Sequence, residues 1–141
     1  AEPHVFLCRE HPLAKQDKIT LEELEDFPYL SYDQGEDNSF YFSEEILSTL
    51  DRKMTIKVSD RATIFNLMVG LNGYTISSGI LSRELNDDKI IAIPLDVEDT
   101  MTMGYLMPHM LEPSPIAKKY LELLKEHIRN YGFEIMEWKK K

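Results

Sequence analysis

Short apolar segments alternate with helical segments that begin at recognisable capping residues, and this alternation constrains the fold more than any other feature of the sequence. Helices that follow strands carry the chain back across a sheet, so successive strands run in the same direction. The sequence therefore predicts the α/β class, with a parallel sheet covered by helices.

Six segments have strand-like patterns. Met54 to Val58 shows the period-two alternation of a strand with one buried face. Lys89 to Leu95 is apolar on both faces, which predicts a central position in the sheet. The complete set is His4 to Arg9, Tyr29 to Tyr32, Met54 to Val58, Tyr74 to Ser78, Lys89 to Leu95 and Met101 to Met107.

Capping residues predict where the helices begin. Thr20 is followed three residues later by Glu23, which makes a capping box, and Ile19 and Leu24 occupy the positions of a hydrophobic staple. Asp60 is a good N-cap for the clearest amphipathic helix. Further helices are expected from Ser39 to Leu50, from Ser82 to Asn86 and after Asp60, where Gly73 should supply a left-handed stop.

The last helix is predicted to open at Ser114, with Pro115 at its first helical position, and to end at Gly132. Seven residues at helical spacing predict a buried stripe along it. They are Ile116, Tyr120, Leu123, Leu124, His127, Ile128 and Tyr131.

Composition excludes several classes of function. A chain of 141 residues with one cysteine has no disulfide framework, and a net charge of −9 argues against a general grip on nucleic-acid phosphates. Its apolar runs are far shorter than the roughly 20 residues that span a bilayer, so no membrane anchor is expected. The start at Ala1 lacks a Met and a signal-like segment, which we interpret as a cut within a longer protein.

Ligands of open α/β sheets bind beyond the carboxyl ends of the strands, where helix N-termini point their N–H groups. Three loops occupy such positions, namely Ser31 to Asn38, Ser59 to Thr63 and Ser77 to Leu81. Their hydroxyl groups, with Arg61 and Gln34, suit a small polar or anionic ligand such as a carboxylate. Ser and Asp beside helix starts also serve as ordinary caps, so each residue taken alone has that simpler explanation.

Motifs of enzymes and metal sites are largely missing. The sequence has no G-x-G-x-x-G, Walker, G-x-S-x-G or H-E-x-x-H motif, and its four histidines are scattered. Cys8 lies within a strand and is interpreted as a small buried side chain, and His127 as a hydrogen-bonded core residue. We therefore expect no catalytic residues, no metal ligands and no cofactor.

The order of the motifs resembles the effector-binding domain of LysR-type transcriptional regulators. His4 to Ala14, a strand followed by the turn His11-Pro12-Leu13-Ala14, resembles that family's crossing strand and the H-P-L-A turn after it. Ile19 to Leu24 resembles the helix that comes next. Phe27 to Leu30 resembles the next strand, Val69 to Ile76 the V-A-A-G-L-G-I-A-L-L-P stretch, and Ser114 to Leu121 the start of the closing helix. Gly70-Leu71-Asn72-Gly73 and Ser77-Ser78-Gly79-Ile80 depart from the family pattern.

The resemblance implies a fold like the type II periplasmic binding proteins, with an effector between two lobes joined by crossing strands near His4 to Arg9 and Ile90 to Leu95. Residues 1–95 would form one complete Rossmann-like lobe with both crossing strands, and 96–141 would return to the other lobe. The resemblance also implies that three loops face the effector. Their residues are Ser31, Tyr32, Asp33, Gln34, Arg61, Ala62, Thr63, Ser77, Ser78 and Gly79.

The resemblance further implies a cytoplasmic, dimeric or larger regulator whose small-molecule effector modulates DNA binding by a separate N-terminal winged helix-turn-helix. Three alternatives remain open from the residues: a solute-binding receptor lobe of a transport system, an enzyme of the same two-lobe fold, and a response-regulator receiver. The enzyme would need a titrating pair, and the receiver an acidic pair after the first strand, where the sequence has Cys8-Arg9-Glu10. An incomplete lobe would also expose apolar surface near Met101 to Met107, which predicts self-association.

Overall fold

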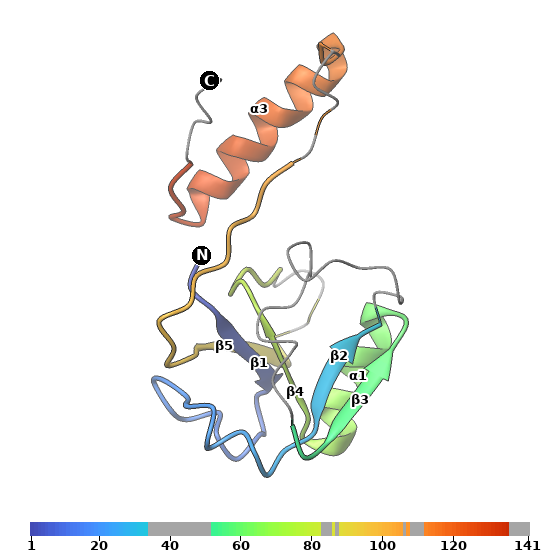
Figure 1. Ribbon diagram of the computed structural model, residues 1–141, viewed down its shortest axis with the longest axis vertical. Helices are drawn as coiled ribbons and strands as arrows, with labels where there is room; N and C mark the ends of the chain where they lie inside the picture. The colour runs from blue at the N-terminus through green and yellow to red at the C-terminus, as the bar shows by residue number, and fades with distance from the viewer. Residues whose placement is uncertain (34–51, 83–85, 87, 106, 108–111, 136–141) are drawn as a thin grey trace. The chain divides into compact units, whose positions relative to one another are not determined.

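The computed structural model describes residues 1–33, 52–82, 86, 88–105, 107 and 112–135. The chain divides into two compact units, Ala1–Thr102 and Met103–Lys141. Among these described residues, the first unit contains a five-stranded sheet and the helix α1 (Arg61–Leu71), and the second contains the helix α3 (Pro115–Asn130) (Figure 1). The predicted helix from Ser39 to Leu50 lies outside the described residues, as does most of the one from Ser82 to Asn86.

The sheet of the first unit is mixed rather than wholly parallel. Its strands are β1 (His4–Cys8), β2 (Tyr29–Tyr32), β3 (Thr55–Val58), β4 (Tyr74–Ser77) and β5 (Ile90–Pro94), in the order β3-β2-β4-β1-β5. β2 pairs in parallel with β3 and β4, whereas β1 is antiparallel to both β4 and β5. The α/β class is confirmed, but the prediction of a purely parallel sheet is wrong at β1.

Two further strand predictions are wrong. β5 is at the end of the strand order and not central. Its apolar pattern instead reflects burial on both faces, because Ile90 and Ile93 belong to two different core clusters. The described residues from Met101 to Met107 form no strand.

The core lies on both faces of the sheet. Along β1, Val5 and Leu7 join a cluster with the segment before β2, which contributes Ile19 and Leu24. The alternate residues of β1, Phe6 and Cys8, join a second cluster under the helix of the first unit. The members of this cluster are Phe6, Cys8, Leu30, Ile64, Met68 and Ile90. The buried Cys8 agrees with its interpretation as a small core residue.

The Thr20 capping box forms, although the segment after it makes turns rather than an α-helix. The backbone N–H of Glu23 donates to Thr20 Oγ1 at 3.3 Å, and the N–H of Thr20 donates to Glu23 Oε2 at 2.9 Å. Backbone bonds three residues apart, such as Leu24 N–H to the Leu21 carbonyl, then hold the turns. The predicted staple residues Ile19 and Leu24 are both fully buried in one cluster.

Helix α1 (Arg61–Leu71) covers one face of the sheet with Ile64 and Met68. Its predicted N-cap is confirmed, because Asp60 accepts a hydrogen bond from the N–H of Thr63. The left-handed residue at its end is Asn72, with φ 51°, and not Gly73. Gly73 is needed for space instead, since a Cβ atom there would lie 2.9 Å from Leu30 Cδ1.

The helix of the second unit, α3 (Pro115–Asn130), begins as predicted. Ser114 Oγ accepts from the N–H of Ala117 at 3.2 Å, and Pro115 occupies the first turn. None of its described residues is buried, however, so the predicted buried stripe is wrong for this chain. His127 is exposed and contacts the Tyr131 ring edge-on at 5.1 Å between centroids, so it is not a core residue.

Candidate functional site

One edge of the sheet gathers most of the predicted ligand-facing residues. Because β2, β3 and β4 run in the same direction, Tyr32, Val58 and Ser77 end their strands at the same edge. Antiparallel β1 begins there, with His4 paired to Ser77 and also to Pro94 of β5. We call this the carboxyl edge of the sheet.

Three of the predicted residues meet in a small pocket at the carboxyl edge. Tyr32, Arg61 and Ser77 all line a cavity of about 80 Å³, and the Arg61 guanidinium lies 5.7 Å from the centroid of the Tyr32 ring. The other residues that line it are Phe6, Ile64, Phe65, Thr75 and Ile76. The cavity thus has an apolar floor, one cation, one phenol and two hydroxyl-bearing residues, Thr75 and Ser77.

This pocket has the chemistry of a partial site for an organic anion. Arginine offers a planar fork of N–H donors that matches a carboxylate, and hydroxyl groups add further hydrogen bonds. Small-molecule sites usually have about 300–1,000 Å³, so the described pocket is smaller than a typical one.

The cap at the start of α1 lies directly beside Arg61 in the chain. Asp60 Oδ1 accepts from the backbone N–H of Thr63 at 2.8 Å, and Asp60 Oδ2 accepts from its hydroxyl at 2.5 Å. These hydrogen bonds lower the pKa of Asp60, because they favour its charged form. Thr63 is therefore part of the cap, and Ala62 is exposed outside the pocket lining.

The remaining predicted residues have structural roles or lie elsewhere. Ser31 and Ser78 are each 8% exposed, and Ser78 Oγ accepts from the N–H of Ile80 at 3.4 Å. The backbone N–H of Asp33 donates to the Val58 carbonyl at 2.7 Å. Gln34 lies outside the described residues.

His4 also lies at the carboxyl edge, although no pattern in the sequence indicates it. Gly79 has φ 82°, and a Cβ atom there would lie 2.6 Å from His4 Nδ1, so the His4 ring lies directly against the glycine backbone. The same ring nitrogen is 2.9 Å from the Glu2 carbonyl. No local signal indicates this contact, because it depends on the antiparallel direction of β1.

A buried histidine lies at the other end of β1. His11 Nε2 is 3.0 Å from the Asn72 carbonyl, and the N–H of Leu13 donates to His11 Nδ1 at 3.1 Å. Since Nδ1 accepts, the neutral ring carries its proton on Nε2 and donates to Asn72. Burial lowers the pKa of His11, and the bond to Asn72 partly offsets this.

Within the described part of the chain, no three His, Cys, Asp or Glu side chains are grouped so that they could hold a metal ion. The same residues include no helix with the length and apolar character needed to cross a membrane.

The family model of the LysR substrate binding domain matches residues 1–129. Comparison with curated protein sequences gives no match.

Solved structures of similar fold include two chains from Pseudomonas aeruginosa. One is the PA01 protein, assigned to the LysR family of transcriptional regulators, with a TM-score of 0.63, 17% identity and coverage of 90% of this chain and 45% of that one. The other is HinK, a LysR family transcriptional regulator, with a TM-score of 0.62, 18% identity and coverage of 90% and 44%. The chain therefore spans less than half the length of these two regulators.

The effector binding domain of QuiR, whose structure is a complex with shikimate, is also similar, with a TM-score of 0.54 and 18% identity. The likeness covers 92% of this chain and 62% of that one. At these identities, the three structures support the fold, and the family follows from the match over residues 1–129. The chain belongs to the LysR substrate binding domain family.

Proposed function

We propose that this chain is the ligand-sensing domain of a LysR-type transcriptional regulator and that it binds a small-molecule effector at the carboxyl edge of its sheet. The observation that carries the proposal is the convergence of Tyr32, Arg61 and Ser77 on one pocket. Arg61 would hold a carboxylate of the effector, Tyr32 would pack against its body, and Ser77 would donate or accept a hydrogen bond.

Residues 1–95 would act as one lobe, with β1 and β5 as the crossing strands, and residues 96–141 would return to the other lobe. The adjacency of β1 and β5, with His4 opposite Pro94, supports this division, because both connections would then leave the sheet beside the effector pocket. Effector binding would favour one arrangement of the lobes by its differential affinity for that arrangement.

The effector signal would reach DNA through a separate winged helix-turn-helix in a cytoplasmic homo-oligomer, and the domain would make no covalent bond with its ligand. The net charge of −9 supports this separation, since it disfavours direct phosphate contacts by this chain. The shared fold with the shikimate-bound QuiR domain supports a small organic acid as the effector class.

The experiment is a calorimetric titration of the chain with a panel of small carboxylates that begins with shikimate, each beside its uncharged methyl ester. We expect at least one acid to bind and its ester to bind about tenfold or more weakly, because the Arg61 contact is charge-assisted. Arg61→Met should abolish that preference. Lys57→Met is the matched control, since Lys57 is an exposed cation on β3 outside the pocket.

Equal binding of acids and esters, or an unchanged acid preference in Arg61→Met, would contradict the assigned role of Arg61. With an acid identified, the full-length regulator should show an altered affinity for its DNA site when that acid is added. An affinity that is the same with and without the acid would exclude the sensing function.

A further inference from the structure

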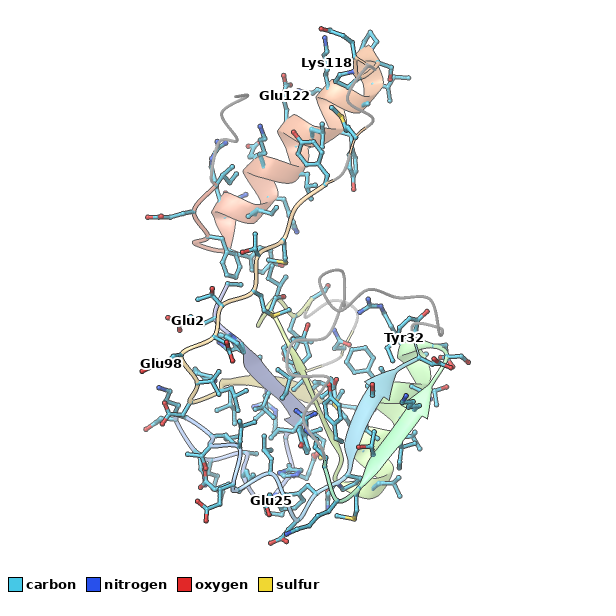
Figure 2. The ribbon with its side chains drawn as sticks, in the orientation of Figure 1. Glu2, Glu25, Tyr32, Glu98, Lys118 and Glu122 are labelled. Atoms are coloured by element: carbon cyan, nitrogen blue, oxygen red, sulfur yellow. The ribbon has the colours of Figure 1, made fainter. Side chains whose placement is uncertain are left out.

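A second and larger cavity lies at the amino ends of β2, β3 and β4, away from the carboxyl edge. Its volume is about 300 Å³, at the lower end of the range for small-molecule sites. Figure 2 shows Glu25, which lines it, at the end of the sheet opposite Tyr32. Its lining residues are Leu21, Leu24, Glu25, Phe27, Arg52, Lys53, Met54 and Tyr74.

Three segments that are distant in sequence build this cavity. The turns before β2 contribute Leu24 and Phe27, the residues before β3 contribute Arg52 to Met54, and β4 contributes Tyr74. Backbone bonds hold the segments together, as the N–H of Tyr29 donates to the Met54 carbonyl at 2.9 Å and the N–H of Tyr74 to the Pro28 carbonyl at 3.0 Å. The cavity is thus part of the folded sheet.

The inner wall of the cavity is apolar and aromatic. Leu24 and Tyr74 are already buried, so the apolar surface open to a ligand belongs to the half-buried Leu21 and Phe27 and to Met54, which is 42% exposed. Such a wall favours the apolar body of a ligand, because burial of apolar surface stabilises the bound state by about 25 cal/mol per Å².

Arg52 supplies a positioned cation beside this wall. Its guanidinium carbon lies 3.8 Å from the centroid of the Tyr29 ring, and the Tyr29 and Tyr74 rings are 5.4 Å apart. Stacking on an aromatic face restricts the guanidinium, and its five N–H donors can serve more than one partner. A carboxylate bound there would lose little further side-chain freedom.

Tyr74 adds a hydroxyl group that stays protonated. Burial raises the pKa of Tyr74, and the positive charge and hydrogen bond of Arg52 offset only part of that effect. A neutral phenol can donate its O–H to an anion.

Lys53 forms the rim together with Glu25. Its Nζ lies 2.7 Å from Glu25 Oε2, and both side chains are more than half exposed. Exposed ion pairs contribute only about 0–1 kcal/mol, so an anionic ligand can take the place of Glu25 beside Lys53 at little cost. The lining has two cations and one carboxylate, and Asp26 adds a second carboxylate close enough to raise the pKa of Lys53 further, so the cations of this cavity are balanced until a ligand displaces Glu25.

We propose that this cavity is a second binding site for a small organic acid with one carboxylate and an apolar, ring-sized body. The carboxylate contacts Arg52 and Lys53, and the ring packs on Leu21, Phe27 and Met54. The site is independent of the effector pocket at the carboxyl edge, and its existence does not require the proposed sensing function.

The test is a titration of the isotope-labelled full chain with phenylacetate, followed by amide shifts in two-dimensional NMR. We expect saturable shifts at Leu24 and Tyr74, whereas phenylacetamide and acetate should bind about tenfold or more weakly because each lacks one half of the ligand chemistry. Shifts confined to Tyr32 and Ser77 would place phenylacetate at the carboxyl edge and overturn the proposal. Absence of saturable shifts, or equal binding of phenylacetamide, would also overturn it.

Substitutions then separate the two sites. Arg52→Met should weaken phenylacetate binding by about tenfold, while Arg61→Met at the other edge should leave it unchanged. If Arg52→Met fails to fold, Lys53→Met on the exposed rim should also weaken phenylacetate binding. Lys57→Met is the matched control, because it removes an exposed cation from β3 outside the cavity and should leave the affinity unchanged. Unchanged affinity in Lys53→Met and in a folded Arg52→Met would exclude the proposed carboxylate contacts.

Discussion

His11 joins the turn after β1 to the end of α1 through both of its ring nitrogens. It donates from Nε2 to the Asn72 carbonyl and accepts at Nδ1 from the N–H of Leu13, and its ring lies 4.3 Å from that of Phe27. Protonation of His11 at Nδ1 would place a second N–H group against the N–H of Leu13. The folded state therefore favours the neutral ring, in agreement with the lowered pKa of His11.

We expect the free energy of unfolding to fall as the pH decreases below about 6.5, the pKa of histidine in the unfolded chain. In that range the unfolded state binds more protons than the folded state, so acid favours unfolding. Chemical denaturation between pH 7.5 and 5 should show a steeper loss of stability in the natural chain than in His11→Gln, which keeps a hydrogen-bonding side chain without the titration. Equal slopes would contradict the role assigned to His11.

Gly79 is a second residue whose substitution has a defined cost. Its φ of 82° is unfavourable for residues with a side chain, and a Cβ atom added there would lie 2.6 Å from His4 Nδ1. Gly79→Ala should therefore destabilise the chain by about 1–3 kcal/mol. Gly70→Ala is the control, because Gly70 is inside α1 with nothing within 4 Å of its Cβ position and should stabilise by about 0.5–1 kcal/mol. Thermal unfolding of both variants measures the difference, and a neutral Gly79→Ala would exclude the close contact with His4.

At the scale of elements, α1 depends on its N-cap. Asp60→Ala should lower Tm, because the N–H of Thr63 loses its acceptor, whereas Asp60→Asn should keep most of the stability, since asparagine is also a good cap. The lowered pKa of Asp60 means that its ionic contribution is present above the pKa of a free carboxyl and is lost as the pH falls through the folded value. Melting curves at pH 7 and pH 3 should therefore differ less for Asp60→Asn than for the natural chain.

Local chemistry in the sequence was sufficient to predict the caps at Thr20, Asp60 and Ser114, because a cap depends on residues three positions apart. It was also sufficient to bring Tyr32, Arg61 and Ser77 together, since parallel strands end at one edge. It did not reveal the direction of β1, which is set by pairing with β4 and β5, and so His4 was missed.

Helical spacing was equally limited for α3. The period of Ile116, Tyr120 and Leu123 correctly indicates one apolar face, but spacing carries no information on what covers that face, and all three are at least half exposed. The left-handed conformation at the end of α1 was predicted for Gly73 but occurs at Asn72. The sequence points to Gly73 because glycine has the stronger preference for that conformation.

At the scale of the whole molecule, the exposed apolar residues predict self-association. Ile116 is 83% exposed and Tyr120 is 62% exposed, with further exposed apolar residues at Met103 and Tyr105. We expect light scattering at high concentration to give a mass above the 16.5 kDa of one chain, because exposed apolar side chains favour association. Ile116→Glu combined with Tyr120→Glu should restore the monomer, while Lys119→Glu on the same helix should not. A monomeric natural chain would contradict this expectation.

The pairing of β1 with β5 has a mechanical consequence. His4 and Pro94 lie opposite each other, so the chain runs into and out of the sheet at one point while the residues between them close on themselves (Figure 1). A pull applied at that point in opposite directions would open the hydrogen bonds between the two strands one after another, as in a zipper, rather than load them all together as in shear. The sheet is therefore compliant at the end where the chain enters β1 and leaves β5.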